Sequence, residues 1–173
     1  GGFDRYSAGS TSVKWYDPPS NSYVGLASTF APFDPTRGGY LTFIRGDRTV
    51  TATSAAPTST TLRTKGNLYQ GDQPPVTIYA NLFTPVNNPY ASPLDLRKID
   101  FSGGMSQSYI VYDPKLGTGS AYGYGAFQTL TLLSDGNYYA FPGGDGSVNS
   151  SYPSFPAPSN FIESGQAFFT QAG

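Results

Sequence analysis

The sequence predicts an all-β domain, built as an antiparallel β-sandwich or a jelly-roll-like fold, and three observations support this. Gly and Pro number 21 and 15 among 173 residues and are spread along the chain, which leaves little room for helices of about ten residues or more. Helix formers are scarce, since Glu163 is the single Glu and Met105 the single Met. The 14 Tyr and 12 Phe supply burial capacity that the few Leu and Ile cannot. One core is expected at this length, so residues 1–173 should form a single domain.

The first strands are predicted as two hairpins. Residues 12–16 alternate in polarity and end at Asp17-Pro18-Pro19, a turn in which proline fixes φ and removes backbone donors. Residues 21–27 form the partner strand. Residues 39–44 are the clearest strand of this region, and a four-residue turn leads from them to a partner over residues 49–53.

Small polar connections separate the extended segments that follow. Residues 54–61 are predicted to be a surface connection. Residues 60–67 and 76–83 flank a loop over residues 70–75, where Gly and paired Pro interrupt regular structure. Residues 85–93 are rich in Asn and Pro and are expected to form an irregular but ordered loop.

The pattern allows at most one short helix, near residues 93–100. Pro93 would occupy the first helical position and Ser92 the N-cap, because proline suits the first turn and a hydroxyl can accept from a free N–H group. The buried side of this helix would carry Leu94, Ile99 and Phe101.

The remaining strands surround Asp135-Gly136, the strongest turn signal in the chain. Residues 127–133 and 137–141 are predicted to form a hairpin around it. A strand over residues 108–112 comes before this hairpin, and residues 166–171 form the last strand. Loops rich in Gly are expected at residues 117–125 and 142–159.

One pattern occurs twice in the chain. A strand ends in Tyr16-Asp17-Pro18, and Gly39 later comes directly before an aromatic strand. A second strand ends in Tyr112-Asp113-Pro114, and Gly165 later comes before another aromatic strand. Two interpretations stay open: two related half-sheets packed together, or chance matches between short segments.

A family resemblance depends on short elements that follow one another in order from residue 13 to residue 171. They are Trp15-Tyr16-Asp17, Arg37-Gly38-Gly39-Tyr40, Gly66-Asn67-Leu68-Tyr69-Gln70-Gly71, Asn88-Pro89-Tyr90-Ala91-Ser92-Pro93-Leu94-Asp95, Ile110-Val111-Tyr112-Asp113-Pro114 and Ser164-Gly165-Gln166-Ala167-Phe168-Phe169. The chain thereby resembles a recurrent β-rich region of secreted and cell-surface proteins of the Bacteroidota, which are substrates of type IX secretion. The Asn-Pro-Tyr and Gly-Gln-x-Phe-Phe elements are its specific features.

This resemblance implies a place in a large multidomain adhesin, filament or enzyme, at the outer cell surface or beyond it. It implies no catalytic residues. The chain opens on Gly-Gly and ends on Ala-Gly without a start methionine, so we expect a segment of a larger secreted protein. The absence of cysteine is more typical of bacterial surface proteins than of secreted eukaryotic modules.

Side chains for most catalytic solutions are missing. The chain has no His and no Cys, which excludes Ser-His-Asp and Cys-His systems and metal sites that need imidazole or thiolate. Carboxyl pairs could serve a glycosidase, but five of the ten Asp residues precede Pro or Gly, as turn residues do; these are Asp17, Asp34, Asp113, Asp135 and Asp145. We therefore predict a protein that is not an enzyme and has no catalytic residues.

Calcium is the one cofactor that the residues leave open. Asp135 and Asn137, and separately Asp145 and Asn149, could offer oxygen ligands. Neither pair follows an EF-hand spacing or a nonapeptide repeat. A hairpin turn and a flexible loop are the favoured explanation of both pairs, so we predict no metal site.

Aromatic side chains are the candidate contact residues: Tyr122, Tyr124, Tyr138, Tyr139, Tyr152 and Phe155. Tyr138 and Tyr139 are adjacent in a strand, so one ring should face outward if the sheet is covered on one side only. Exposed rings bind sugar faces and also form protein interfaces. The alternative is that these rings pack beneath the long loops. Trp15, in the middle of a strand, is expected to be a core residue.

The composition also limits the partners. Ten basic and eleven acidic residues give a net charge of −1 without a basic patch, so nucleic acid is not expected. No apolar run approaches the roughly 20 residues of a membrane helix, so membrane insertion is not expected. We predict a non-catalytic structural or adhesive module that contacts neighbouring domains or copies of itself, in a surface filament for example. The alternative is a carbohydrate-binding module attached to a glycan-degrading enzyme.

Overall fold

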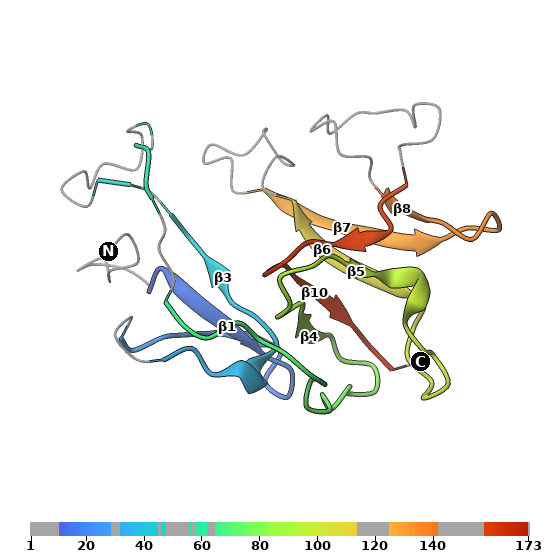
Figure 1. Cartoon of the computed structure of the whole chain (residues 1–173). Helices are drawn as coiled ribbons and strands as arrows, with labels where there is room; N and C mark the ends of the chain where they lie inside the picture. Colours follow the sequence, from blue (N-terminus) through green and yellow to red (C-terminus); the bar gives the residue numbers. More distant parts are fainter. Residues whose placement is uncertain are drawn as a thin grey trace.

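The computed structural model describes residues 11–28, 32–44, 46–47, 56, 58–61, 65–113, 125–141 and 158–172. Their strands form three antiparallel sheets (Figure 1). The first sheet has the order β2-β1-β3, with β1 Val13–Asp17, β2 Ser22–Gly25 and β3 Leu41–Thr42. The second has the order β4-β10-β6-β7-β8, with β4 Thr84–Asn87, β6 Ser108–Asp113, β7 Ala126–Leu132, β8 Tyr138–Phe141 and β10 Ala167–Thr170. The third pairs β5 Leu94–Asp95 with β9 Phe161–Ile162.

The described helical residues form two single 3-10 turns, η1 Pro35–Arg37 and η2 Leu96–Lys98. The prediction of an all-β, sandwich-like fold is therefore confirmed. The described part of the chain contains no helix with the length and apolar character needed to span a membrane.

The first predicted hairpin is formed by β1 and β2. The turn between them is stabilised by Asn21 N–H, which donates to the carbonyl oxygen of Pro18 at 3.1 Å. The Ser20 hydroxyl donates to the Asp17 carboxylate at 2.5 Å. The strand predicted over residues 39–44 is shorter, because only Leu41–Thr42 pair with β1. Its expected partner over residues 49–53 lies outside the described residues.

The second sheet contains the predicted strands β6, β7, β8 and β10, together with one strand that the sequence did not predict. β4 forms where an irregular loop was expected over residues 85–93. Pro85 is compatible with this strand because β4 pairs with β10 alone among the described strands, and proline is tolerated at a sheet edge.

The prediction of a short helix near residues 93–100 is wrong both in the residue that caps it and in its length. Leu94–Asp95 pair with β9, and a single 3-10 turn follows. Asp95, and not Ser92, caps this turn, since its Oδ1 accepts from Arg97 N–H at 3.1 Å. The carbonyl oxygen of Ser92 instead accepts from the side chain of Asn88. Pairing of this segment with β9 thus replaced the helix that the local sequence allowed.

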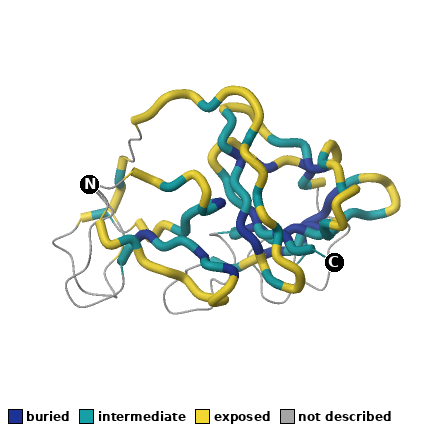
Figure 2. The backbone as a smooth tube through the Cα atoms, turned by 90° about the horizontal axis from the view of Figure 1, so that it is seen from below, coloured by how far each residue is buried: buried dark blue, intermediate teal, exposed yellow. Residues whose placement is uncertain are grey.

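The core lies on one face of the second sheet. Its buried side chains come from β6, β7, β8 and β10, and from η2 and β9 opposite them: Leu96, Tyr109, Val111, Leu130, Tyr138, Ala140, Ile162 and Phe168. Leu94, Ile99 and Phe101 pack against this cluster, as expected. Buried residues concentrate in this part of the molecule and are fewer in the first sheet (Figure 2).

The two larger sheets share an arrangement that matches the repeated sequence pattern. In each sheet, the strand that ends in Tyr-Asp lies between two others: the next strand of its hairpin, and the strand that follows the Gly of the repeated pattern. The orders are β2-β1-β3 in the first sheet and β7-β6-β10 in the second. In each hairpin the Asp pairs with the first residue of the next strand. The Tyr before it faces a second ring, Tyr16 opposite Tyr23 and Tyr112 opposite Phe127. Both ring pairs have centroids 5.3 Å apart, at interplanar angles of 67° and 68°. This agreement favours two related halves over chance matches.

Candidate functional site

Most of the predicted contact rings lie outside the described residues: Tyr122, Tyr124, Tyr152 and Phe155. The other two, Tyr138 and Tyr139, lie in β8, and both are buried. One ring was expected to face outward if the sheet was covered on one side only, but neither ring faces solvent, because both side chains are buried. Tyr138 packs against Tyr109 in the core, with ring centroids 5.4 Å apart. The Tyr139 hydroxyl donates to the Asp135 carboxylate at 2.7 Å.

The buried core tyrosines are held in their neutral form. Burial raises the pKa of Tyr109 strongly, and the neighbouring Tyr138 raises it further. Burial also raises the pKa of Tyr138. A phenol with a raised pKa does not lose its proton near neutral pH. These side chains are therefore uncharged at neutral pH and pack in the core.

A different set of rings lies where the first two sheets meet, and part of it is exposed. We call it the aromatic junction: Tyr16, Tyr23, Tyr112, Phe127 and Phe169. Tyr16 contacts Tyr23 and Phe169, at centroid distances of 5.3 and 5.2 Å. Phe127 contacts Phe169 at 5.7 Å and Tyr112 at 5.3 Å. Two of the five rings are well exposed, Tyr23 at 39% and Phe127 at 42%.

The fold produces this junction by bringing together five strands, because each ring comes from a different one of β1, β2, β6, β7 and β10. Phe169 follows Phe168 in β10, and adjacent strand residues point to opposite faces. Phe168 therefore enters the core while Phe169 meets the first sheet. The sequence did contain a signal for the junction, namely the aromatic residues that pair across each hairpin, Tyr16 with Tyr23 and Tyr112 with Phe127. Sequence reasoning missed it because nothing local shows that the two hairpins pack together.

The electrostatics of the aromatic junction keep its tyrosines uncharged. Burial raises the pKa of Tyr16, Tyr23 and Tyr112. The carboxylates of Asp17 and Asp113 add to this effect at Tyr16 and Tyr112, respectively. The Tyr16 hydroxyl donates to the Asn21 side chain at 2.5 Å. The junction thus presents neutral rings with a few hydroxyl groups.

The rings of the junction pack edge to face. Rings in contact stand at 67°, 86°, 77° and 68° to one another. The two exposed rings, Tyr23 and Phe127, are of the aromatic type that is enriched at the centre of protein interfaces.

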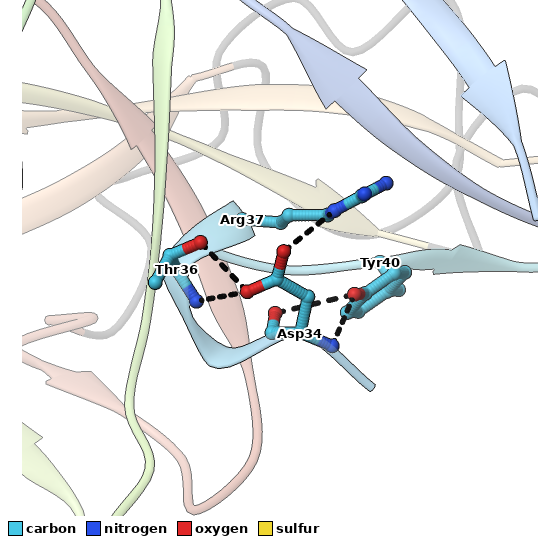
Figure 3. A network of polar contacts seen from close by, with 4 residues as sticks. All are labelled: Asp34, Thr36, Arg37 and Tyr40. Atoms are coloured by element: carbon cyan, nitrogen blue, oxygen red, sulfur yellow. Dashed lines mark hydrogen bonds and ion pairs between the residues drawn. The ribbon is translucent and has the colours of Figure 1, made fainter. Parts of the chain in front are cut away.

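A second polar and aromatic cluster surrounds η1 (Figure 3). The Asp34 carboxylate accepts from the Thr36 N–H and hydroxyl groups and from Arg37 Nε, and these contacts, the Thr36 hydroxyl first, lower the pKa of Asp34. Tyr40 Oη accepts from the Asp34 N–H group and donates to the Asp34 carbonyl oxygen. The Arg37 guanidinium lies 4.2 Å from the ring centroid of Trp15. Trp15 is half-buried beneath it, so this cluster has a structural role.

Of the candidate calcium ligands, Asp135 and Asn137 lie within the described residues, and the carboxylate oxygens of Asp135 already accept hydrogen bonds within the hairpin. Asp135 Oδ1 accepts from Asn137 N–H at 3.0 Å, and Oδ2 accepts from the Asn137 side chain and the Tyr139 hydroxyl. These contacts, the Tyr139 hydroxyl first, lower the pKa of Asp135. Asp145 and Asn149 lie outside the described residues. Within the described ranges, no group of three or more acidic side chains could hold a metal ion.

A cavity of about 290 Å³ lies at one end of the core, between β6, β7 and β9. Val111, Leu130 and Ile162 supply apolar walls, and Gln128 and Gln166 supply amides. Asp113 is the single charged side chain among the described residues that line it. One carboxylate does not make the acid–base pair that glycoside hydrolysis requires.

Comparison of the chain with protein-family models, with curated proteins and with solved structures finds no match. The resemblance to the Bacteroidota surface region therefore stays a prediction.

Proposed function

We propose that this chain is a non-catalytic structural or adhesive module of a large secreted bacterial surface protein, and that it works by contact through its aromatic surface. The observation that supports this best is the aromatic junction, in which Tyr23 and Phe127 expose rings that five strands hold in place. Exposed rings on a rigid scaffold lose little side-chain entropy on binding. Monomeric soluble proteins seldom leave clustered rings of this kind without a partner.

The proposed location is the outer cell surface or the extracellular space. The resemblance to secreted Bacteroidota proteins and the absence of cysteine support it. The proposed partners are neighbouring domains of the same polypeptide and copies of this chain. The near absence of net charge, −1 overall, leaves little repulsion between copies.

The experiment compares adhesion by the wild-type chain and by Phe127→Ser. Beads that carry the purified wild-type chain should adhere to one another, and Phe127→Ser should reduce this adhesion severalfold, because it removes the most exposed ring of the junction. Leu68→Ser is the matched control, since Leu68 is 65% exposed and is not part of the junction. Circular dichroism and thermal melting verify that both variants fold.

The same preparations applied to a glycan array test the alternative function. Glycan binding that disappears in Phe127→Ser would replace the proposal with a carbohydrate-binding module. Adhesion that is unaffected by Phe127→Ser, or an absence of adhesion in the wild type, would contradict the proposal. Glycan hydrolysis that copurifies with the chain and survives rigorous purification would contradict its non-catalytic part.

A further inference from the structure

β2 is an edge strand without the features that protect sheet edges. All four of its residues are exposed, and among the described strands it pairs with β1 alone. Edges are usually blocked by proline, charge or a very short strand. β4 contains Pro85, and β3 has two residues. β2, with the sequence Ser-Tyr-Val-Gly, has neither proline nor charge.

The hydrogen bonds of the first hairpin show which backbone groups point outward. Leu26 N–H donates to the carbonyl oxygen of Val13 at 2.9 Å. Backbone groups of successive strand residues alternate between the two neighbouring strands. Val24 therefore faces β1 with its N–H and C=O groups, and Tyr23 and Gly25 direct theirs to the open edge.

The related half of the molecule shows how this fold completes the equivalent edge. β7 corresponds to β2, and β8 pairs antiparallel along the outer edge of β7. When the two hairpins are aligned on their Tyr-Asp turns, Gly25 corresponds to Thr129, which pairs with Phe141 of β8. An added antiparallel strand is therefore the arrangement that the first sheet lacks within the described residues.

We propose that a second copy of this chain supplies the missing strand, by antiparallel pairing of β2 with β2 of the partner across a two-fold axis. The axis would pass beside Val24, so that Val24 lies opposite its own counterpart. Tyr23 of each copy would then exchange two backbone hydrogen bonds with Gly25 of the other. Two three-stranded sheets would become one continuous six-stranded sheet.

This register agrees with the side chains. Residues directly opposite one another in an antiparallel pair share a face of the sheet, so each Tyr23 ring would lie beside Gly25 of the other copy and meet the Thr11 side chain, which fills the space above that glycine. Val24, 38% exposed, would bury its side chain against an identical one. The inference deepens the self-association in the proposed function, on which it rests.

Cysteine cross-linking tests the pairing directly. The chain contains no cysteine, so Val24→Cys introduces a single thiol. The two Val24 positions form a non-hydrogen-bonded pair, whose Cβ atoms lie about 5 Å apart, close enough for a disulfide after a small shift. We expect Val24→Cys to form disulfide-linked dimers under mild oxidation. Ile44→Cys, at a position 37% exposed beyond the opposite strand of the sheet, is the matched control and should stay monomeric.

Charge pairing gives an independent measurement on the full chain. Sedimentation should show the wild type as a concentration-dependent dimer, and Val24→Lys and Val24→Glu as monomers, because like charges would meet at the axis. An equal mixture of the two variants should restore the dimer. A wild-type monomer at all concentrations, equal cross-linking of both cysteine variants, or no recovery in the mixture would overturn the proposal.

The outcomes separate this inference from the proposed function. Loss of bead adhesion in Phe127→Ser with the sedimenting dimer intact would support the aromatic contact and the β2 pairing as separate interactions. A monomer whose beads still adhere through Phe127 would overturn the β2 pairing alone. If sedimentation shows a dimer that Val24→Lys disrupts, while beads carrying the wild-type chain never adhere, the adhesive function would be contradicted and the β2 pairing would be supported.

Discussion

At the scale of single residues, Asn88 joins the Asn-Pro-Tyr element to the segment before β10. It is 1% exposed, and its side-chain amide donates to the carbonyl oxygens of Ser92, Ile162 and Glu163 at 2.8, 3.0 and 3.2 Å. Its Oδ1 accepts from Tyr90 N–H at 3.1 Å. The Asn-Pro-Tyr element is thereby attached to the segment before β10. We infer that this element is distinctive because it organises the fold.

Replacement of Asn88 should be among the most destabilising polar substitutions in the chain. Asn88→Ala removes three hydrogen bonds, one of them to the carbonyl oxygen of the buried Ile162, and we expect the free energy of unfolding to fall by about 2–3 kcal/mol. Urea denaturation measures this change. Asn87→Ala is the control, since Asn87 is only half-buried and its Oδ1 accepts from Gln73 Nε2 at 3.4 Å. Equal stability of the two variants would contradict this role of Asn88.

At the scale of elements, η1 and its cap set the spacing between the first sheet and β4. Asp34 caps the turn, and Gly38 ends it at φ 67°. A Cβ atom on Gly38 would overlap the carbonyl oxygen of Pro85. Gly38 is therefore required both by its backbone conformation and by the close approach of β4.

These two requirements can be separated with a second glycine. Gly136 has φ 79° and open space around it, so Gly136→Ala should cost about 1–2 kcal/mol for the backbone alone. Gly38→Ala should cost about 1–3 kcal/mol more, because it also forces β4 to move. Chemical denaturation of both variants gives the difference. If the two costs agree, β4 yields freely and the close approach does not constrain the sheets.

At the scale of the whole molecule, the two related halves differ in how they are stabilised. The second sheet has the core cluster on one face and Phe169 on the other. In the first sheet, Val13 and Tyr16 are the buried hydrophobic side chains among the described residues. The first sheet therefore depends on the aromatic junction for much of its burial.

Hydrogen exchange should detect this asymmetry. We expect the hydrogen-bonded amides of β1 to exchange at least roughly tenfold faster than those of β6, because less stable units open more often. Phe169→Ala should widen the difference, since it removes the ring between the two hairpins. Phe161→Ala is the control, because Phe161 is 50% exposed, lies in β9 and is not one of the five junction rings. Equal protection of both sheets would show that they open as one unit.

Local chemistry by itself determined a large part of the fold. The shortage of helix formers and the spacing of Gly and Pro predicted the all-β class. The Asp17-Pro18 and Asp135-Gly136 turns located the β1–β2 and β7–β8 hairpins, because proline and glycine constrain the backbone whatever surrounds them. The repeated Tyr-Asp-Pro pattern indicated the two halves.

Only the tertiary structure decided what each strand meets. Pro85 is tolerated in β4 because the tertiary structure places this strand at an edge of the sheet. Asp95, and not Ser92, caps the 3-10 turn because β5 pairs with β9. The tertiary structure also buried Tyr138 and Tyr139, two of the predicted contact residues, and left the rings of Tyr23 and Phe127 exposed. Burial depends on which faces of distant strands come together, and hydrophobic attraction has no direction that a short segment could encode. The contact surface therefore appears only when the two halves are packed against each other.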